Sequence, residues 1–384
     1  MAENIMTGLL KRLSVLLSKI KRNLSLINFE YGFFDEVFIE ITSRCNFHCE
    51  FCPSDSLQRK KNDLKDEYML KILNELQGKN KPIAFHVLGE PLLNEFFFKY
   101  LSICDRYDIE VHPTTNMSLL TEDVLEKMLS HKSVTLIQLS FQTITEEDFR
   151  IRGSAMSFGK YFQMLEKIVF NEKRISSNAI IYINVMNDLH CYHDKLWGMF
   201  SPEKFWAFLD TVEKWKERLI SQGAVEKSRR EPQCGEFYYR RREDIPKDFY
   251  NRADEITYEI TPNLVIWVKH VGKFGMSDSF VKYLNNRRSS KYKIINIPRP
   301  VPVPCWSVRV PCVLSDGTIT CCCVDIEGEL AIGNIADMTI QEAALSKKRN
   351  LVMKHPELYK TCRKCRGTLA FSKRPMPYNP ILFE

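Results

Sequence analysis

Three closely spaced cysteines are the residues of this sequence best suited to chemistry. Cys45, Cys49 and Cys52 lie in the segment RCNFHCEFC with the spacing C-x3-C-x2-C, directly after a strand-like stretch. Four cysteine thiolates normally complete a [4Fe-4S] cluster, so three would leave one iron open to bind another molecule. Zinc is the alternative, because it favours four ligands and His48 could supply the fourth. The spacing therefore indicates a metal centre.

A second group of cysteines lies near the C-terminus. Cys305 precedes an Asp-Gly turn, and Cys321, Cys322 and Cys323 follow the strand-like segment GTIT. A CxxC pair, Cys362 and Cys365, comes later in the chain. A β-hairpin and a distant CxxC pair can together supply four thiolates to an iron–sulfur cluster or to zinc.

The cysteine content fits metal ligation better than disulfide bonding. The chain has 384 residues, 13 cysteines and a net charge of +7 from 55 basic and 48 acidic residues. A chain of this length does not need disulfides to fold, and Met1–Asn28 lacks the pattern of a secretory signal. No uncharged apolar run is long enough to cross a membrane. We therefore expect metal or cluster sites in a reducing cytosol.

Strand-like and helix-like segments alternate along the first three quarters of the chain. The strand-like segments are Glu36–Thr42, Pro82–Leu88, Ile109–His112, Val134–Ser140, Ala179–Met186 and Asn263–His270. The helical segments are Glu67–Gln77, Asn94–Tyr107, Thr121–His131 with Thr121 as the N-cap, Ser157–Lys173 and Pro202–Ile220. This alternation predicts an α/β fold with a parallel sheet, a partial (β/α)6 TIM-like barrel with its site at the carboxyl ends of the strands.

The composition divides the chain into three parts. Residues 1–34 contain a basic amphipathic helix, Gly8–Leu26, which would either pack on its own protein or dock on an anionic membrane surface or partner. Residues 35–280 would form the core, with a charged insertion or long loop at about 221–254. The proline-rich stretch Pro298–Pro311 cannot be a regular helix, and it opens a small cysteine-rich domain over residues 298–384.

The first cysteine motif resembles the signature of the radical S-adenosylmethionine (radical SAM) superfamily. The resemblance rests on C-x3-C-x2-C after the first strand and on an aromatic residue, here Phe51, before the third cysteine. It implies that the open iron binds the amino and carboxylate groups of S-adenosylmethionine. It also implies that one electron then releases a 5′-deoxyadenosyl radical, which abstracts hydrogen from a substrate.

Two later motifs strengthen the resemblance. Gly89 and Glu90 in HVLGEPLL resemble the family's GGE-type motif at the methionine amine, although Leu88 replaces its first glycine. Thr115 and Asn116 in PTTN resemble the position that meets the ribose. The alternatives are a simple strand-to-loop turn at the first motif and a polar strand cap at the second.

The fourth and fifth strands carry the remaining matches. Ser140 and Arg152 resemble the residues that hold the methionine carboxylate, to which arginine offers a planar, bidentate partner. A surface salt bridge is the alternative for Arg152. Asn184 or Asn187, at the end of the fifth strand, could contact adenosine.

The second cysteine group resembles the SPASM and twitch auxiliary-cluster domains of the same superfamily. Their pattern has a cysteine, then G-x4-C about a dozen residues later, and then a CxxC pair. The resemblance implies one auxiliary [4Fe-4S] cluster on Cys305, Cys322, Cys362 and Cys365. Cys323 could replace Cys322, and Cys312 could replace Cys305.

These matches predict a radical SAM enzyme that oxidatively modifies a peptide or a small metabolite. Flavodoxin or ferredoxin would reduce it, and it would be cytoplasmic, with peripheral membrane contact through the N-terminal helix as an option. No residue can be named as a substrate base. The alternatives are a membrane-associated radical SAM enzyme that acts on a lipid or methyl acceptor, and a non-enzymatic cysteine-rich protein that binds metal or nucleic acid. Dispersed basic residues argue against nucleic acid.

Overall fold

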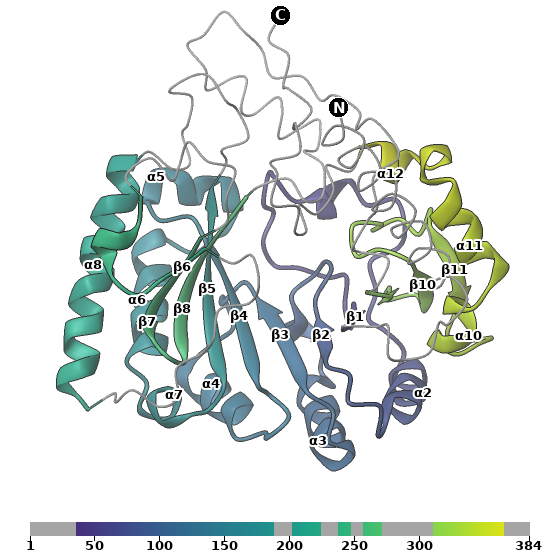
Figure 1. Ribbon diagram of the computed structural model, residues 1–384, viewed down its shortest axis with the longest axis horizontal. Coiled ribbons are helices and arrows are strands. Elements are labelled where there is room, and N and C mark those ends of the chain that lie inside the picture. Colours follow the sequence, from purple (N-terminus) through teal and green to yellow (C-terminus); the bar gives the residue numbers. More distant parts are fainter. Residues whose placement is uncertain (1–35, 188–201, 224–236, 247–255, 271–309, 365–384) are drawn as a thin grey trace, which may run out of the picture.

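The computed structural model describes residues 36–187, 202–223, 237–246, 256–270 and 310–364. A sheet of eleven strands organises them, in the order β11-β10-β9-β1-β2-β3-β4-β5-β8-β7-β6 (Figure 1). The six expected strands are adjacent and parallel: β1 (Val37–Ile39), β2 (Ile83–Phe85), β3 (Val111–Thr115), β4 (Leu136–Gln142), β5 (Ile180–Asn187) and β8 (Leu264–His270). The open, barrel-like α/β architecture predicted from the sequence is therefore confirmed.

Helices cover one face of this sheet (Figure 1). They are α2 (Asp66–Leu76), α3 (Phe97–Tyr107), α4 (Glu122–Leu129), α6 (Phe158–Val169) and α8 (Pro202–Ser221). The hydroxyl of Thr121 caps α4 by accepting from the Val124 amide, as the sequence predicts. On β4, Ile137, Leu139 and Phe141 alternate with more exposed residues, and Phe141 stacks on Tyr161 of α6 with ring centroids 5.6 Å apart. The period-two pattern thus turns the apolar residues toward the helices.

The sheet is mixed, which corrects the expectation of a purely parallel one. Strand β7 (Ile256–Thr261) pairs antiparallel with β8, and β6 (Phe237–Tyr239) pairs parallel with β7. The segment interpreted as a charged insertion therefore contributes an edge strand to the sheet. The arginines that follow β6 suggested a solvated loop. Strand β6 is short and pairs only with β7 among the described strands. Pairing of this kind joins residues far apart in the chain, so no local sequence pattern indicates it.

The C-terminal hairpin extends the same sheet beyond β1. Strand β9 (Cys312–Val313) pairs parallel with β1, and β10 (Thr318–Thr320) and β11 (Ala331–Asn334) follow antiparallel. Gly317 forms the turn before β10 with φ of +86°, a conformation that favours glycine. Three helices follow: α10 (Ile340–Ala344), α11 (Lys347–Lys354) and α12 (Lys360–Lys364). The cysteine-rich segment thus packs directly beside the first strand.

Several expectations fall outside the described residues. These are the N-terminal helix, residues 224–236 and 247–254 of the charged insertion, the proline-rich stretch up to residue 309, Cys305 and Cys365. Among the residues that are described, no helix is both long enough and apolar enough to span a membrane.

Candidate functional site

The residues expected at the site meet where β1 to β4 end. At their centre is Glu90, which follows β2 and is fully buried. Its carboxylate accepts hydrogen bonds from Thr115 Oγ1 at 2.7 Å, from the Asn116 amide at 2.6 Å and from the Leu92 amide at 3.2 Å. Burial raises the pKa of Glu90 to about 7, against the opposing effect of these donors. Glu90 thus ties the end of β2 to the end of β3.

Each thiol of the first motif faces a hydrogen-bond donor. Cys45 accepts hydrogen bonds from the Phe47 backbone amide and from the Asn116 side chain, whose Nδ2 lies 3.6 Å from the sulfur. The Arg152 guanidinium hydrogen-bonds to Cys49, and the Ser54 amide does so to Cys52. Burial is nevertheless the largest influence and raises the pKa of all three thiols, that of Cys52 to about 12. The site therefore suits sulfurs that become thiolates only when a positive centre binds them.

Arg152 lies beneath the cysteine loop and is 1% exposed, so the surface salt bridge considered for it is wrong. Its Nη1 donates to the carbonyls of Ser140 at 2.8 Å and Phe141 at 3.2 Å. The guanidinium also lies over the rings of Phe47 and Phe51, at 5.1 Å and 5.8 Å from their centroids. Arg152 therefore joins the end of β4 to the cysteine loop, and Ser140 takes part through its carbonyl.

Gly89 allows a close approach between backbones. Its φ is +78°, and a Cβ there would lie 2.2 Å from the Thr42 carbonyl oxygen and 2.9 Å from that of Arg44. The protein's own backbone therefore fills the space that a side chain at position 89 would occupy. Positive φ also occurs at Val87, which precedes it on the same loop, with φ of +100°. Such strain in a β-branched residue is common at functional sites.

Leu88 stands where the family motif has its first glycine. It is buried in a small apolar cluster with Val87, Cys312 and Leu314, which joins the end of β2 to the C-terminal hairpin. Cys52 and Cys323 pack against this same cluster. The two cysteine groups therefore flank one shared apolar layer.

His48 does not complete a zinc site in this arrangement. Its Nδ1 lies 3.1 Å from Asp55 Oδ1, and its side chain is 64% exposed. Nowhere in the described residues do three His, Cys, Asp or Glu side chains gather around a position for one metal ion.

The second cysteine group lies on the hairpin side of the sheet. Cys321 and Cys322 are buried directly after β10, and Cys362 on α12 is half-buried. Burial raises the pKa of Cys321 to about 12, and the charges of Cys322 and Cys362 add to this rise. Cys322 acts in the same direction on the buried Cys312. Cys321, Cys322 and Cys362 thus belong to the main apolar core and Cys312 to the smaller cluster beside it, while Cys305 and Cys365 lie outside the described residues.

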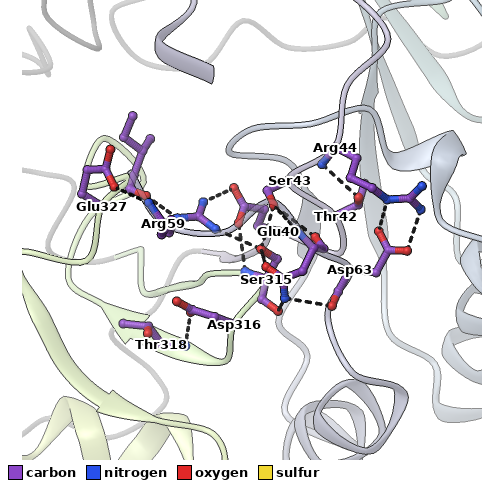
Figure 2. Close-up of polar contacts among 12 residues, drawn as sticks. Glu40, Thr42, Ser43, Arg44, Arg59, Asp63, Ser315, Asp316, Thr318 and Glu327 are labelled. Atoms are coloured by element: carbon purple, nitrogen blue, oxygen red, sulfur yellow. Dashed lines mark hydrogen bonds and ion pairs between the residues drawn. The ribbon is translucent and has the colours of Figure 1, made fainter. Parts of the chain in front are cut away.

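A buried polar network connects the cysteine loop with the hairpin (Figure 2). Arg59 Nη2 lies 2.6 Å from the fully buried Glu40, and Arg59 Nη1 donates to Ser315 Oγ at 2.9 Å. The other oxygen of Glu40 accepts from the Ser315 amide at 2.9 Å. The Glu327 carboxylate accepts from the backbone amides of Gln58 and Arg59. Sequence reasoning missed this network, because its partners are far apart in the chain.

Tyr161 is another residue of the site that sequence reasoning missed. Its hydroxyl donates to the Asn116 carbonyl at 2.8 Å and lies 3.1 Å from the Ser140 carbonyl, so it joins the ends of β3 and β4. Its only signal was its position on the apolar face of a helix.

Comparison with known proteins identifies the family. Residues 39–190 match the model of the radical SAM superfamily, and residues 305–366 match an iron–sulfur cluster-binding domain, SPASM. The fold and the site define an α/β-barrel iron–sulfur protein, and residues 39–190 form a domain of the radical SAM superfamily, whose members are enzymes. Membership implies a [4Fe-4S] cluster and S-adenosylmethionine as cofactors, and the second domain implies auxiliary iron–sulfur binding. The non-enzymatic alternative is therefore wrong.

Two curated relatives match part of the chain. The tungsten-containing aldehyde ferredoxin oxidoreductase cofactor-modifying protein of Pyrococcus furiosus is 30% identical over 144 residues, 37% of this chain and 40% of that protein. The GTP 3′,8-cyclase of Campylobacter lari is 29% identical over 118 residues, 29% of this chain and 36% of that protein. The chain thus covers about two fifths of the length of these relatives.

The fold also resembles a solved structure. SuiB of Streptococcus suis, crystallised with the precursor peptide SuiA, aligns with a TM-score of 0.50 and 14% identity over 94% of this chain and 76% of that chain. This likeness supports the fold.

Proposed function

We propose that Cys45, Cys49 and Cys52 hold a [4Fe-4S] cluster with which this chain cleaves S-adenosylmethionine. When bound, such a cluster supplies the electron that releases a 5′-deoxyadenosyl radical, which abstracts hydrogen from the substrate. The observation that carries the proposal is the set of donors facing the three sulfurs. Hydrogen bonds to cluster sulfurs stabilise their negative charge and help to set the reduction potential.

The chain's own residues would position the two partners of this reaction. Asn116 contacts Cys45 through its side chain and Glu90 through its backbone amide, so it links the two motifs. Glu90 lies beside the cysteine loop, because its amide donates to the Arg44 carbonyl at 2.8 Å. It would accept a hydrogen bond from the methionine ammonium, as a buried carboxylate can. Arg152 would orient the loop from below, and Phe51 would shield the site from water.

The substrate and the reductant belong to the same proposal. We expect a flavodoxin or ferredoxin as reductant and an oxidative modification of a peptide or small metabolite as the reaction. The auxiliary site would hold one [4Fe-4S] cluster on Cys322, Cys362, Cys365 and either Cys305 or Cys312. The burial of Cys312, Cys321 and Cys322 on the hairpin side of the sheet supports a site there, with Cys321 as a further candidate ligand.

Iron content tests the cluster assignment. The full chain, reconstituted anaerobically, should bind about eight irons, and the Cys45/Cys49/Cys52→Ala variant about four. Cys104→Ala is the matched control, because Cys104 is buried within α3 away from both groups and should leave the iron content unchanged. An unchanged iron content in the triple variant would refute the assignment.

Location is a further prediction. A cytoplasmic protein with its N-terminal helix at an anionic membrane surface should lose vesicle binding when residues 1–26 are deleted. Sedimentation with phosphatidylserine vesicles measures this. Equal sedimentation of the full and shortened chains would contradict membrane docking and favour a helix that packs on its own protein.

A further inference from the structure

Residues of the cysteine-rich domain hold both ends of the cysteine loop (Figure 2). Before the loop, Ser43 Oγ accepts a hydrogen bond from Ser315 Oγ at 3.1 Å. After the loop, Arg59 Nε donates to the Ile326 carbonyl at 2.5 Å, and the Glu327 carboxylate accepts from the Arg59 amide. Ser43 and Ser315 are fully buried, and the Arg59 side chain is only 9% exposed. The segment that carries the first three cysteines is therefore fixed at both ends by residues that follow β9 and β10.

The turn of residues 325–330 connects Arg59 with the second cysteine group. Asp325 is fully buried, and its carboxylate accepts hydrogen bonds from the amides of Glu329 and Leu330, at 2.9 Å and 2.7 Å. The Glu329 carboxylate accepts from the first two amides of α12, each at 2.7 Å, and α12 carries Cys362. The residues that bind Arg59 after the loop lie in this same turn. Hydrogen bonds therefore run from the helix of Cys362 to the loop of the first cysteines.

Arg59 is the residue at which these contacts meet. Its guanidinium donates to three separate groups: Glu40 Oε1 at 2.6 Å, Ser315 Oγ at 2.9 Å and the Ile326 carbonyl. The planar guanidinium presents its donors in a fixed fork, so it sets the positions of these three partners relative to one another. Arg59→Lys would keep a positive charge opposite Glu40, but an ammonium cannot hold all three partners in this geometry.

We propose that Arg59 is a positioning residue through which a filled auxiliary site strengthens S-adenosylmethionine binding at the first cysteine group. Ligation by Cys322 and Cys362 would hold α12 against the hairpin, and Glu329 would then fix the turn to which Arg59 binds. Arg59 in turn fixes the end of the cysteine loop. The inference rests on the proposed function, because it requires both sites. By linkage, S-adenosylmethionine bound at the first site favours the filled auxiliary site by the same factor.

A double-mutant cycle on the reconstituted full chain tests this coupling. Cys362→Ala empties the auxiliary site, Arg59→Lys breaks the contacts of the fork, and the double variant combines both changes. Arg174→Lys is the matched control, because Arg174 is also fully buried but donates to Asn263 Oδ1, at the start of β8 and away from the loop. Two quantities are measured: hydrogen exchange of the backbone amides in residues 43–62, by mass spectrometry without S-adenosylmethionine, and the dissociation constant of S-adenosylmethionine.

We expect Cys362→Ala to lose about four irons, to exchange faster in residues 43–62 and to bind S-adenosylmethionine about tenfold more weakly. Arg59→Lys should show the same two changes while it keeps about eight irons, and the double variant should add nothing further, because both changes break one connection. The control should match the parent. Full additivity of the two changes, parent-like exchange and affinity in Arg59→Lys, or a full iron content in Cys362→Ala would overturn the proposal.

Two further measurements separate this test from misfolding and from failure of the proposed function. If Arg59→Lys does not fold, Glu329→Gln takes its place in the cycle, since it keeps the fork and weakens only the contact with α12; additivity with Cys362→Ala would again overturn the proposal. Formation of 5′-deoxyadenosine by the parent reports on the proposed function alone. Its absence would leave the exchange result intact, whereas its presence together with additive variants would refute only the coupling.

Discussion

At the scale of single residues, Glu90 shows how burial and hydrogen bonding compete. The side chain is fully buried, yet three donors from two strand ends point at its carboxylate. Burial has the larger effect and raises its pKa to about 7. Such a residue gains or loses its charge near neutral pH, and an ammonium beside it would favour the charged form.

The pH dependence of stability tests this environment. A carboxyl group whose pKa is higher in the folded state than in the unfolded state stabilises the fold at low pH, and this contribution is lost as pH rises through the folded pKa. From about pH 5.5 to 7, the free energy of unfolding should therefore fall by about 2 kcal/mol relative to Glu90→Gln, and the difference should become constant only above about pH 8. Denaturant midpoints of both proteins measure this, and parallel pH profiles would refute the shifted pKa.

Gly89 tests the close approach between the end of β2 and the cysteine loop. Gly89→Ala places a Cβ against backbone that cannot move aside, so we expect a loss of about 4 kcal/mol or more and poor iron incorporation. Gly78→Ala is the matched control, since Gly78 has φ of +71° and nothing within 4 Å of the added Cβ. It should cost only about 1–2 kcal/mol. Equal losses of stability would contradict this explanation.

At the scale of elements, the cysteine loop is held from two sides. Below it, the turn after β4 supplies Arg152, and the amide of His48 donates to the Arg152 carbonyl at 3.2 Å. Beside it, Arg59 and Glu40 fix the chain after the loop to the hairpin of β9 and β10 (Figure 2). The loop's geometry therefore depends on elements on both sides of β1.

The Arg59–Glu40 ion pair can be tested against an exposed one. Arg59→Ala leaves the Glu40 charge buried without its partner and should cost about 3–5 kcal/mol. Arg44→Ala removes the Asp63 pair, whose arginine is 47% exposed, and should cost at most about 1 kcal/mol. Thermal unfolding of both variants measures the difference. Equal destabilisation would show that the buried network does not hold the hairpin in place.

Elements with local patterns could be predicted from the sequence. Helix α4 and the six parallel strands follow from apolar periodicity and capping, because those signals lie within each segment. The pairing of β9 with β1 could not be predicted, since it joins residues far apart in the chain. For the same reason, the sequence named Arg152 as a site residue but did not show that it binds carbonyls from below the loop.

At the scale of the whole molecule, one sheet carries both cysteine groups. The first follows β1 and the second follows β10, and β9 lies between these two strands. The apolar cluster of Val87, Leu88, Cys312 and Leu314 fills the space that both groups flank. A continuous sheet therefore fixes how the two groups lie relative to each other.

The central claim is that the first cysteine group supports reductive cleavage of S-adenosylmethionine. The most direct measurement is 5′-deoxyadenosine, separated by chromatography, after the anaerobically reconstituted chain is reduced with dithionite in the presence of S-adenosylmethionine. We predict that the parent and Cys104→Ala form it and that Cys45/Cys49/Cys52→Ala does not. Its absence from a parent that contains the full iron content, or its formation by the triple variant, would contradict the account.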